Sequence, residues 1–171
     1  MKEIIIHESF NPANKHNDIA LLILEKPAKL SPHINTICLP DQYESFEGIE
    51  CAVAGWGEKE FHEEGKYAKV MKKVELPIVP RETCIKPLRK TTFGIFFHSG
   101  FICAGGVKGI DSCKGDGGGP LACTRPTGEY VQTGIVSWGI GCGQEGVPGV
   151  YLKVSEFIYW IEYHLLEKGF E

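Results

Sequence analysis

The sequence lacks a basic run, a long apolar segment and a glycosylation sequon. Its 18 Lys and Arg residues are outnumbered by 22 Asp and Glu residues, for a net charge of −4, so we do not expect a nucleic acid partner. No apolar stretch approaches the roughly 18 residues of a membrane helix, and residues 1–7 are too short and too charged for a signal-peptide core. We therefore expect no membrane span, no export signal within these residues and no N-linked glycan.

Cysteine is plentiful, but no two of the seven form a Cys-x-x-Cys pair. A zinc or redox motif is therefore not expected, and we expect neither a metal nor a cofactor. A disulfide framework is the better interpretation, although the sequence alone allows about a hundred ways to form three bridges and leave one thiol. The cysteines are Cys38, Cys51, Cys84, Cys103, Cys113, Cys123 and Cys142.

The 171 residues are 43% hydrophobic and 23% charged, which is enough for one sizeable core or two small ones. Residues 3–7 and 19–24 are rich in Ile and Leu and predict two short strands. An alternating apolar pattern that starts at Val70 predicts a half-buried strand over residues 70–78, and residues 80–88 predict a short helix.

Four glycines and two aspartates are crowded into residues 111–120, Asp-Ser-Cys-Lys-Gly-Asp-Gly-Gly-Gly-Pro. Ordered glycine costs conformational entropy, so clustered glycine implies a shaped backbone with positive φ or a close approach to a bound group. The run resembles the nucleophile loop of chymotrypsin-like serine proteases, Asp-Ser-Cys-x-Gly-Asp-Ser-Gly-Gly-Pro. Gly117 stands where that family has its nucleophilic serine.

The resemblance implies that this replacement removes catalysis. In the family the serine attacks the scissile carbonyl, a histidine takes its proton and an aspartate orients the imidazole. Loss of the nucleophile lowers turnover by about 10⁶. Only the backbone N–H groups of Gly115 and Gly117, which match the oxyanion hole of the family, would remain to stabilise negative charge.

Of the other two triad positions, only the aspartate has a matching motif in the sequence. Residues 17–22, Asn-Asp-Ile-Ala-Leu-Leu, match the family's Asp-Ile-Ala-Leu-Leu and place Asp18 at the triad aspartate, although the motif alone equally fits a strand-entry aspartate. The family's histidine motif, Ala-Ala-His-Cys, does not occur in the sequence. His16 is a poor replacement base, because residues two apart on a strand point alongside each other, and we expect it to be a surface turn residue.

The resemblance extends over residues 3–165. Residues 34–40 match the linker between the two barrels of the family, and residues 51–57, Cys-Ala-Val-Ala-Gly-Trp-Gly, match the strand that opens the second barrel. The implied fold class is all-β, a chymotrypsin-like double β-barrel with a C-terminal helix and an incomplete first barrel. Residues 1–40 would be the remnant of the first barrel with the inter-barrel linker, and residues 41–171 the second barrel with the helix.

The residues near the carboxyl end predict a helix. Ser155 is the predicted N-cap, and Phe157, Ile161 and Leu165 recur at helical spacing. We expect this apolar face to dock the helix onto the barrel.

The resemblance also implies a trypsin-like specificity pocket. Asp111 matches its base, where a carboxylate in an apolar slot favours a Lys or Arg side chain; the alternative is a relic in a closed pocket. The wall and the open side of the pocket correspond to Ser137, Trp138, Gly139 and Gly149.

Asp116 matches the carboxylate that pairs with the new amino terminus in active members of the family. That amino terminus is absent from this sequence, and a buried unpaired charge is costly. We therefore expect Asp116 to turn to another partner and residues 115–119 to stay zymogen-like or mobile.

The resemblance reduces the disulfide alternatives to one set: Cys51 with Cys123, Cys84 with Cys103, and Cys113 with Cys142. Cys38 is left over. In the family, the cysteine at this place ties the protease domain to an N-terminal pro-segment, so we expect Cys38 to bond to a missing amino-terminal regulatory segment.

Residues 89–105 hold an aromatic cluster, for which core packing and a partner patch both remain open. With Leu88 before it and Gly106 after it, this stretch resembles the arthropod clip-domain serine protease homologues of the prophenoloxidase-activating-factor type. Those homologues also carry Gly at the nucleophile position. The sequence departs from their commonest pattern, Gly-Asp-Gly-Gly-Ser-Pro, in having Gly119 before the proline.

The resemblance thus implies a secreted, catalytically inactive serine protease homologue. It would act as a binding or regulatory cofactor in an extracellular protease cascade of innate immunity or melanisation, with a protease or prophenoloxidase as its partner. One alternative is a trypsin-like endopeptidase that cleaves after Lys or Arg, in a partial or inactivated chain, which the Asp111 pocket favours. Another is a non-functional partial product, because two strands of a barrel without their neighbours expose unpaired edges.

Overall fold

The structure is a computed structural model that describes residues 1–58, 66–89 and 97–170. The described residues form mostly strands, with two α-helices and one 3₁₀ turn, η2. The elements are β1 (Glu3–Ile6), β2 (Ala20–Ile23), β3 (Glu50–Gly55), β4 (Lys72–Val79), α1 (Arg81–Leu88), β5 (Phe101–Gly105), β6 (Pro120–Thr124), β7 (Tyr130–Trp138), β8 (Pro148–Lys153), η2 (Val154–Glu156) and α2 (Ile158–Glu167).

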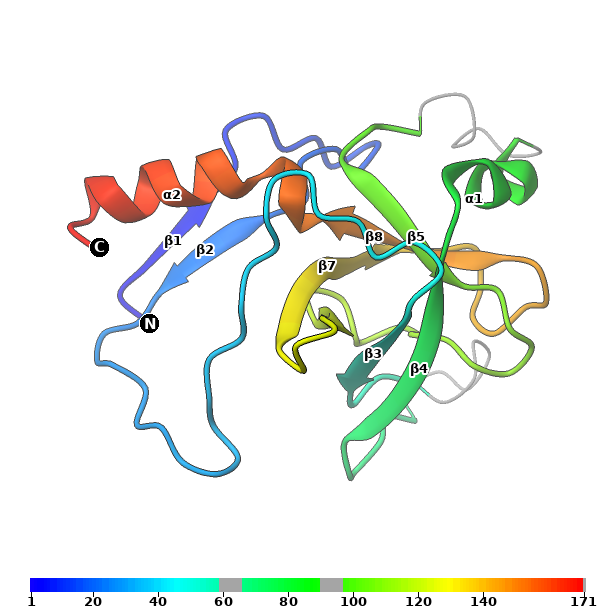
Figure 1. The fold of residues 1–171 in the computed structure, drawn as a ribbon, viewed down its shortest axis with the longest axis horizontal. Helices are drawn as coiled ribbons and strands as arrows, with labels where there is room; N and C mark the ends of the chain where they lie inside the picture. The colour runs from blue at the N-terminus through cyan, green and yellow to red at the C-terminus, as the bar shows by residue number, and fades with distance from the viewer. Residues whose placement is uncertain (59–65, 90–96, 171) are drawn as a thin grey trace.

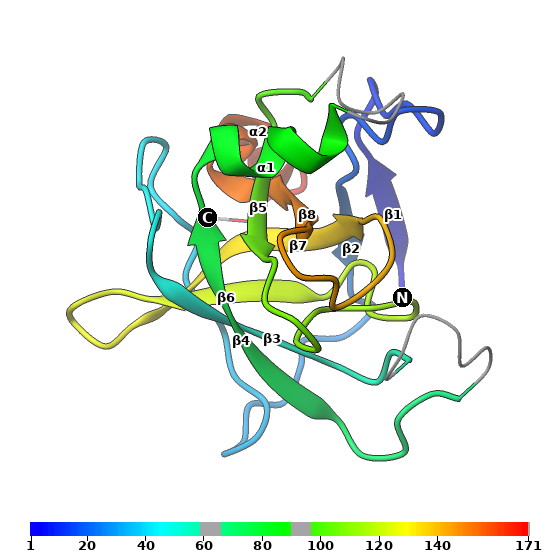
Figure 2. The ribbon, with the colours of Figure 1, turned by 90° about the vertical axis from the view of Figure 1, so that its right-hand side faces the viewer.

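Strands β3 to β8 close into an antiparallel barrel in the order β3-β4-β5-β8-β7-β6 (Figure 2). Alternate side chains point inward, as strand geometry requires, and Leu76, Leu121 and Tyr151 in the barrel interior are 0% exposed. The strand predicted over residues 70–78 is confirmed as β4, but the prediction for Val70 is wrong. Val70 is 71% exposed because the chain still bends there, before β4 begins.

Strands β1 and β2 form a separate antiparallel pair, in which Ile4 lies opposite Leu22 (Figure 1). The pair lies beside the barrel, with α2 running alongside it. Its neighbour Ile19 packs with Phe157 and Ile161 of the α2 region. On the other face Ile4 and Leu22 are 52% and 58% exposed. The predicted fold class is confirmed: the described residues hold one closed six-stranded barrel, two strands of the first barrel and a C-terminal helix.

Polar contacts also join the amino-terminal segment to α2. Glu8 accepts a hydrogen bond from Trp160 Nε1 at 2.9 Å, and its other carboxylate oxygen lies 2.9 Å from His164 Nε2. Lys168 donates to the Glu3 carboxylate at 2.6 Å. These contacts hold the short β1–β2 pair against the helix. Asp18 lies two residues before β2, so the same contacts help to position it.

The start of the last helix differs from the prediction. Ser155 lies inside η2, and α2 begins only at Ile158, with Phe157 as the capping residue. The chain first tightens into a 3₁₀ turn, in which the Phe157 N–H donates to Val154 O at 2.9 Å, so the N-cap prediction for Ser155 is wrong. The docking face is confirmed, since Phe157 and Ile161 are buried against the barrel.

The aromatic stretch is described only in part, because residues 90–96 lie outside the described residues. Phe97 and Phe101 are buried in a cluster with the disulfide of α1 and β5, which joins Cys84 to Cys103. Core packing therefore accounts for these two rings, and the partner patch stays a prediction. Across residues 1–58, 66–89 and 97–170, no helix is long and apolar enough to cross a membrane.

Candidate functional site

The glycine-rich loop before β6 is docked on β7 by backbone hydrogen bonds. Within the loop, the Asp116 N–H donates to Cys113 O at 3.0 Å, and the Gly119 N–H donates to Asp116 O at 2.9 Å. Towards β7, the Gly118 N–H donates to Val136 O, and the Val136 N–H donates back to Gly119 O, both at 2.9 Å. The loop is thus attached to the barrel at its second half.

The two glycines predicted to form an oxyanion hole, Gly115 and Gly117, differ in how strictly the fold requires glycine. Gly115 has φ +95°, and a Cβ there would lie 2.7 Å from the Tyr67 ring, so only glycine fits. A Cβ at Gly117 would meet nothing within 4 Å. The fold therefore has room for a side chain at residue 117, and no steric conflict requires glycine there.

A cavity of about 230 Å³ lies between this loop and β7. It brings together all of the residues that the sequence assigns to the pocket and to the oxyanion hole. These lining residues are Asp111, Gly115, Gly117, Ser137, Trp138, Gly139 and Gly149.

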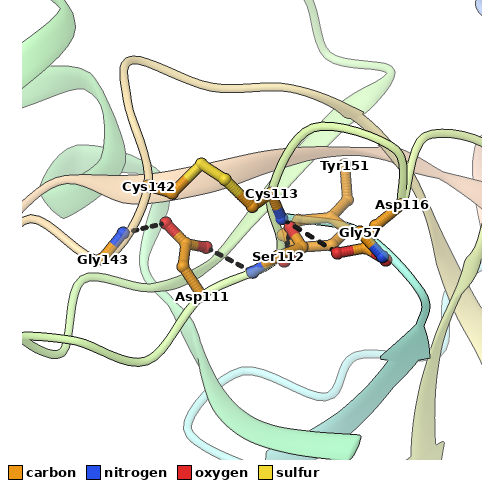
Figure 3. The surroundings of a disulfide bond; sticks show 8 residues. All are labelled: Gly57, Asp111, Ser112, Cys113, Asp116, Cys142, Gly143 and Tyr151. Atoms are coloured by element: carbon orange, nitrogen blue, oxygen red, sulfur yellow. Dashed lines mark hydrogen bonds between the residues drawn. A yellow bond between two sulfur atoms is a disulfide. The ribbon is translucent and has the colours of Figure 1, made fainter. Parts of the chain in front are cut away.

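Asp111 is held at the base of this cavity by two backbone donors (Figure 3). The Gly143 N–H donates to Asp111 Oδ2 and the Ser112 N–H donates to Asp111 Oδ1, each at 2.9 Å. Burial raises the pKa of Asp111, although both hydrogen bonds act in the opposite direction. A carboxylate has about four lone-pair directions, so two remain for a ligand cation.

A disulfide and a tyrosine frame the base of the cavity. Cys113 is bonded to Cys142, which joins the loop to the segment before β8. The buried Tyr151 hydroxyl lies 2.9 Å from Ser112 Oγ. Sequence reasoning missed Tyr151. The available signal was the single hydroxyl within residues 148–152 of β8, which are otherwise apolar, because a buried tyrosine needs a hydrogen-bond partner.

A family model described as Trypsin matches residues 1–161. The chain belongs to the trypsin-like serine protease family. The match includes both the β1–β2 pair and the barrel, so it covers the whole candidate site.

Three similar proteins show which members of this family the chain resembles. Phenoloxidase-activating factor 2 of Galleria mellonella is 47% identical, over 97% of this chain and 56% of the relative. Inactive CLIP domain-containing serine protease A28 of Anopheles gambiae is 46% identical, over 98% of this chain and 44% of the relative. Coagulation factor XII of Cavia porcellus is 39% identical, over 93% of this chain and 28% of the relative. The chain spans about half the length of the first two relatives.

Asp18, the predicted counterpart of the family's triad aspartate, is hydrogen-bonded to Ser137 of β7, which lines the cavity. Ser137 Oγ donates to Asp18 Oδ2 at 2.7 Å, across 119 residues of sequence. His16 pairs with Asn11 across the turn at residues 12–15 and is partly exposed, with its ring 4.5 Å from that of His98.

Asp116 faces the end of β3 (Figure 3). Its carboxylate accepts hydrogen bonds from the Gly57 N–H at 2.8 Å and from the Cys113 N–H at 3.0 Å. It lines a larger cavity of about 710 Å³, of which Asp111 forms another wall. Its charge is therefore satisfied by backbone donors of this chain, and the mobility of residues 115–119 stays a prediction.

All seven cysteines are described. The disulfides join the three pairs that the resemblance implies, and Cys38 is the free thiol. Within the described part of the chain, no group of three metal-ligating side chains is placed to hold an ion.

Proposed function

We propose that the chain is a catalytically inactive serine protease homologue that acts by binding, as a regulatory component of an extracellular proteolytic cascade. The observation that carries this proposal is Gly117, which stands at the nucleophile position with open space around it. The hydrogen bond that Asp18 accepts from Ser137, and the absence of the family's histidine motif from this sequence, support it. The names of two relatives, one an inactive protease and one a phenoloxidase-activating factor, support a role in phenoloxidase activation in innate immunity.

The pocket is the proposed point of contact with a protein partner, a protease or prophenoloxidase of the same cascade. Its cavity of about 230 Å³ has a carboxylate at the base, and a Lys or Arg side chain would reach Asp111 by a charge-assisted hydrogen bond. Because Gly117 cannot attack, the bound segment would be held and not cut. In this role residues 41–171 would form the binding unit, with residues 1–40 docked against it.

Secretion is part of the proposal. Three disulfides in a chain of this size favour an oxidising compartment, because cytosolic thiols are kept reduced. Cys38, the remaining thiol, would bond to a regulatory segment of the same protein.

The pocket frame also favours a second function, a trypsin-like endopeptidase represented by a partial or inactivated chain. The two are separated by incubating the purified chain with a lysine ester substrate and with benzamidine, a flat aromatic amidinium. The proposed binder should bind benzamidine and release no product above the buffer rate. Turnover inhibited by benzamidine would establish the endopeptidase instead.

Replacing Gly117 by Ser is expected to leave the chain inactive. The side chain fits, since nothing lies within 4 Å of the new Cβ. The sequence has no match to the family's histidine motif, and a serine hydroxyl without a general base is a weak nucleophile. Loss of a triad member costs about 10⁴ to 10⁶ in turnover. The measurement is ester hydrolysis together with labelling by a fluorophosphonate. Gly117→Ala is the matched control, and activity in the Ser variant alone would show that a base is present after all.

As the pH falls, benzamidine binding is expected to begin to weaken at a higher pH than it would if Asp111 had the pKa of an ordinary aspartate. Burial raises the pKa of Asp111, and only its ionised form attracts the amidinium. For the same reason, Asp111 lowers the free energy of unfolding as the pH rises from the ordinary aspartate pKa through the raised pKa. A bound cation offsets this loss of stability. Calorimetric titration from neutral pH down to about pH 4 tests this expectation. An affinity that stays constant over this range contradicts it.

A further inference from the structure

The last helix, α2, presents apolar side chains on two opposite faces. On the inner face, Ile161 and the capping residue Phe157 are buried against the barrel. The outer face carries Tyr159, Tyr163 and Leu166, which recur at i, i+4 and i+7 and are 66%, 58% and 69% exposed. Residues at this spacing lie on one side of a helix, and a side that faces water is normally polar. We call these three residues the outer stripe, and folding leaves most of their surface exposed.

Both tyrosine rings of the outer stripe are held in place by their hydroxyl groups. Tyr159 Oη donates to Gln42 Oε1 at 2.8 Å, and Tyr163 Oη donates to Glu167 Oε1 at 2.9 Å. Each hydroxyl thus has a partner within the chain, so a ligand that covers the ring does not have to supply one. Rings that are already fixed lose little conformational freedom when a partner packs on them. The stripe is therefore prepared for an apolar contact.

Acidic side chains flank the outer stripe. The helical period places Glu162, which is exposed, on one flank and Glu167 on the other. The ten residues of α2 include no Lys or Arg, and the side chain of their one histidine, His164, is only 12% exposed. Lys168, just after the helix, is bonded to the Glu3 carboxylate at 2.6 Å. The apolar stripe therefore has a negatively charged rim.

We propose that the outer stripe binds an amphipathic helix of a partner protein, with an apolar face that packs on the stripe and Lys or Arg side chains that lie beside Glu162 and Glu167. Side chains three and four residues apart form a ridge, which fits between the ridges of a second helix about 8–10 Å away. Opposite charges at the rim select the partner and its orientation. No residue of α2 is among those that the structure places around the cavity of the candidate site, so this surface goes beyond the proposed function.

Two other occupants suit the stripe less well. If two copies of the chain packed α2 on α2, an antiparallel pair would bring Glu162 near its own copy, and a parallel pair would bring Glu162 near Glu167. Carboxylates would meet carboxylates in both arrangements, and like charges across an interface are repulsive. A phospholipid surface is also a poor match, because helices that lie on membranes place Lys and Arg around their apolar face.

The test measures binding of the 171-residue chain to fluorescent peptides of about 20 residues, long enough to form a helix. The first peptide has leucines along one helical face and lysines beside them. The second has glutamate in place of each lysine, and the third keeps the lysines but scatters the leucines around the helix. By fluorescence anisotropy, we expect the first peptide to bind about tenfold more tightly than either of the others. Equal binding of the scattered peptide would mean that charge alone attracts it, and this result overturns the inference.

Variants locate the binding. Tyr163→Ala should weaken binding of the first peptide about tenfold, and Glu162→Lys should remove most of its preference for lysine over glutamate. Both residues are exposed, so the melting temperature should stay close to that of the parent. Tyr130→Ala and Glu145→Lys are the matched controls, because they make the same changes at exposed residues outside α2. Controls that weaken binding as much as the variants of α2 contradict the proposed surface.

Benzamidine separates this inference from the proposed function. An excess of benzamidine should leave peptide binding unchanged, because the two sites are distinct. Displacement of the peptide would place it in the Asp111 cavity, which overturns the inference and supports the proposed function. A peptide that binds a chain without affinity for benzamidine supports the inference while the pocket proposal fails.

The other occupants are tested on the same proteins. Sedimentation that shows a dimer of the parent chain and a monomer of Tyr163→Ala assigns the stripe to self-association and overturns the inference. Binding to vesicles of phosphatidylcholine and phosphatidylserine that is lost in Tyr163→Ala overturns it in favour of a lipid surface. A monomer that binds the first peptide and leaves vesicles unbound supports it.

Discussion

Replacing Asp111 by Asn is expected to lower the affinity for benzamidine about 10- to 100-fold, because a hydrogen bond to a charged group contributes roughly 1.5–3 kcal/mol. The Asp111 carboxylate lines the cavity, and its backbone donors leave acceptor positions for an amidinium. The Asn side chain keeps the shape and one acceptor oxygen but loses the charge.

Calorimetric titration of the folded variant measures this effect, with the melting temperature as a check on the fold. Glu145→Gln is the matched control, because it removes one exposed negative charge near the pocket without lining the cavity. An Asp111→Asn protein that binds benzamidine as tightly as the parent would show that the pocket is closed to the ligand. The proposed contact with a Lys or Arg side chain would then be abandoned.

Removal of the disulfide between Cys51 and Cys123 is expected to lower the free energy of unfolding by about 4 kcal/mol. The bond spans 72 residues, so its loss releases a large loop in the unfolded chain. It also joins β3 to β6, which are paired through only two residue pairs, Ala52 with Ala122 and Val53 with Leu121. The double replacement by Ala therefore weakens the barrel at one of its two shortest strand pairings, the other being that of β4 with β5.

The corresponding replacement of Cys84 and Cys103 is the internal comparison. That bond spans only 19 residues, and the same chain-entropy relation predicts a loss of about 3 kcal/mol. Urea unfolding of both double variants measures the two losses. If the shorter loop proves the more costly, packing around the sulfur atoms, and not chain entropy, decides the stability of this barrel.

Much of the site could be read from sequence because it depends on short segments. Residues 111–120 display a contiguous pattern in which a single glycine replaces a serine, and the cysteines are countable. The barrel strands also follow local alternation, as at Leu76 and Ile78. Local rules failed at Ser155, where a 3₁₀ turn precedes the helix, and they did not indicate that His16 packs against His98 of a distant segment.

The sequence by itself determined the absence of a nucleophile at Gly117, the odd number of cysteines and the run of short strands, because each is a property of residue identity or of local period. Only the tertiary structure decided that Ser137 bonds to Asp18 and that Asp116 is satisfied by Gly57. Closure of the barrel brings together residues that are far apart in the chain, and no local pattern specifies which of them meet.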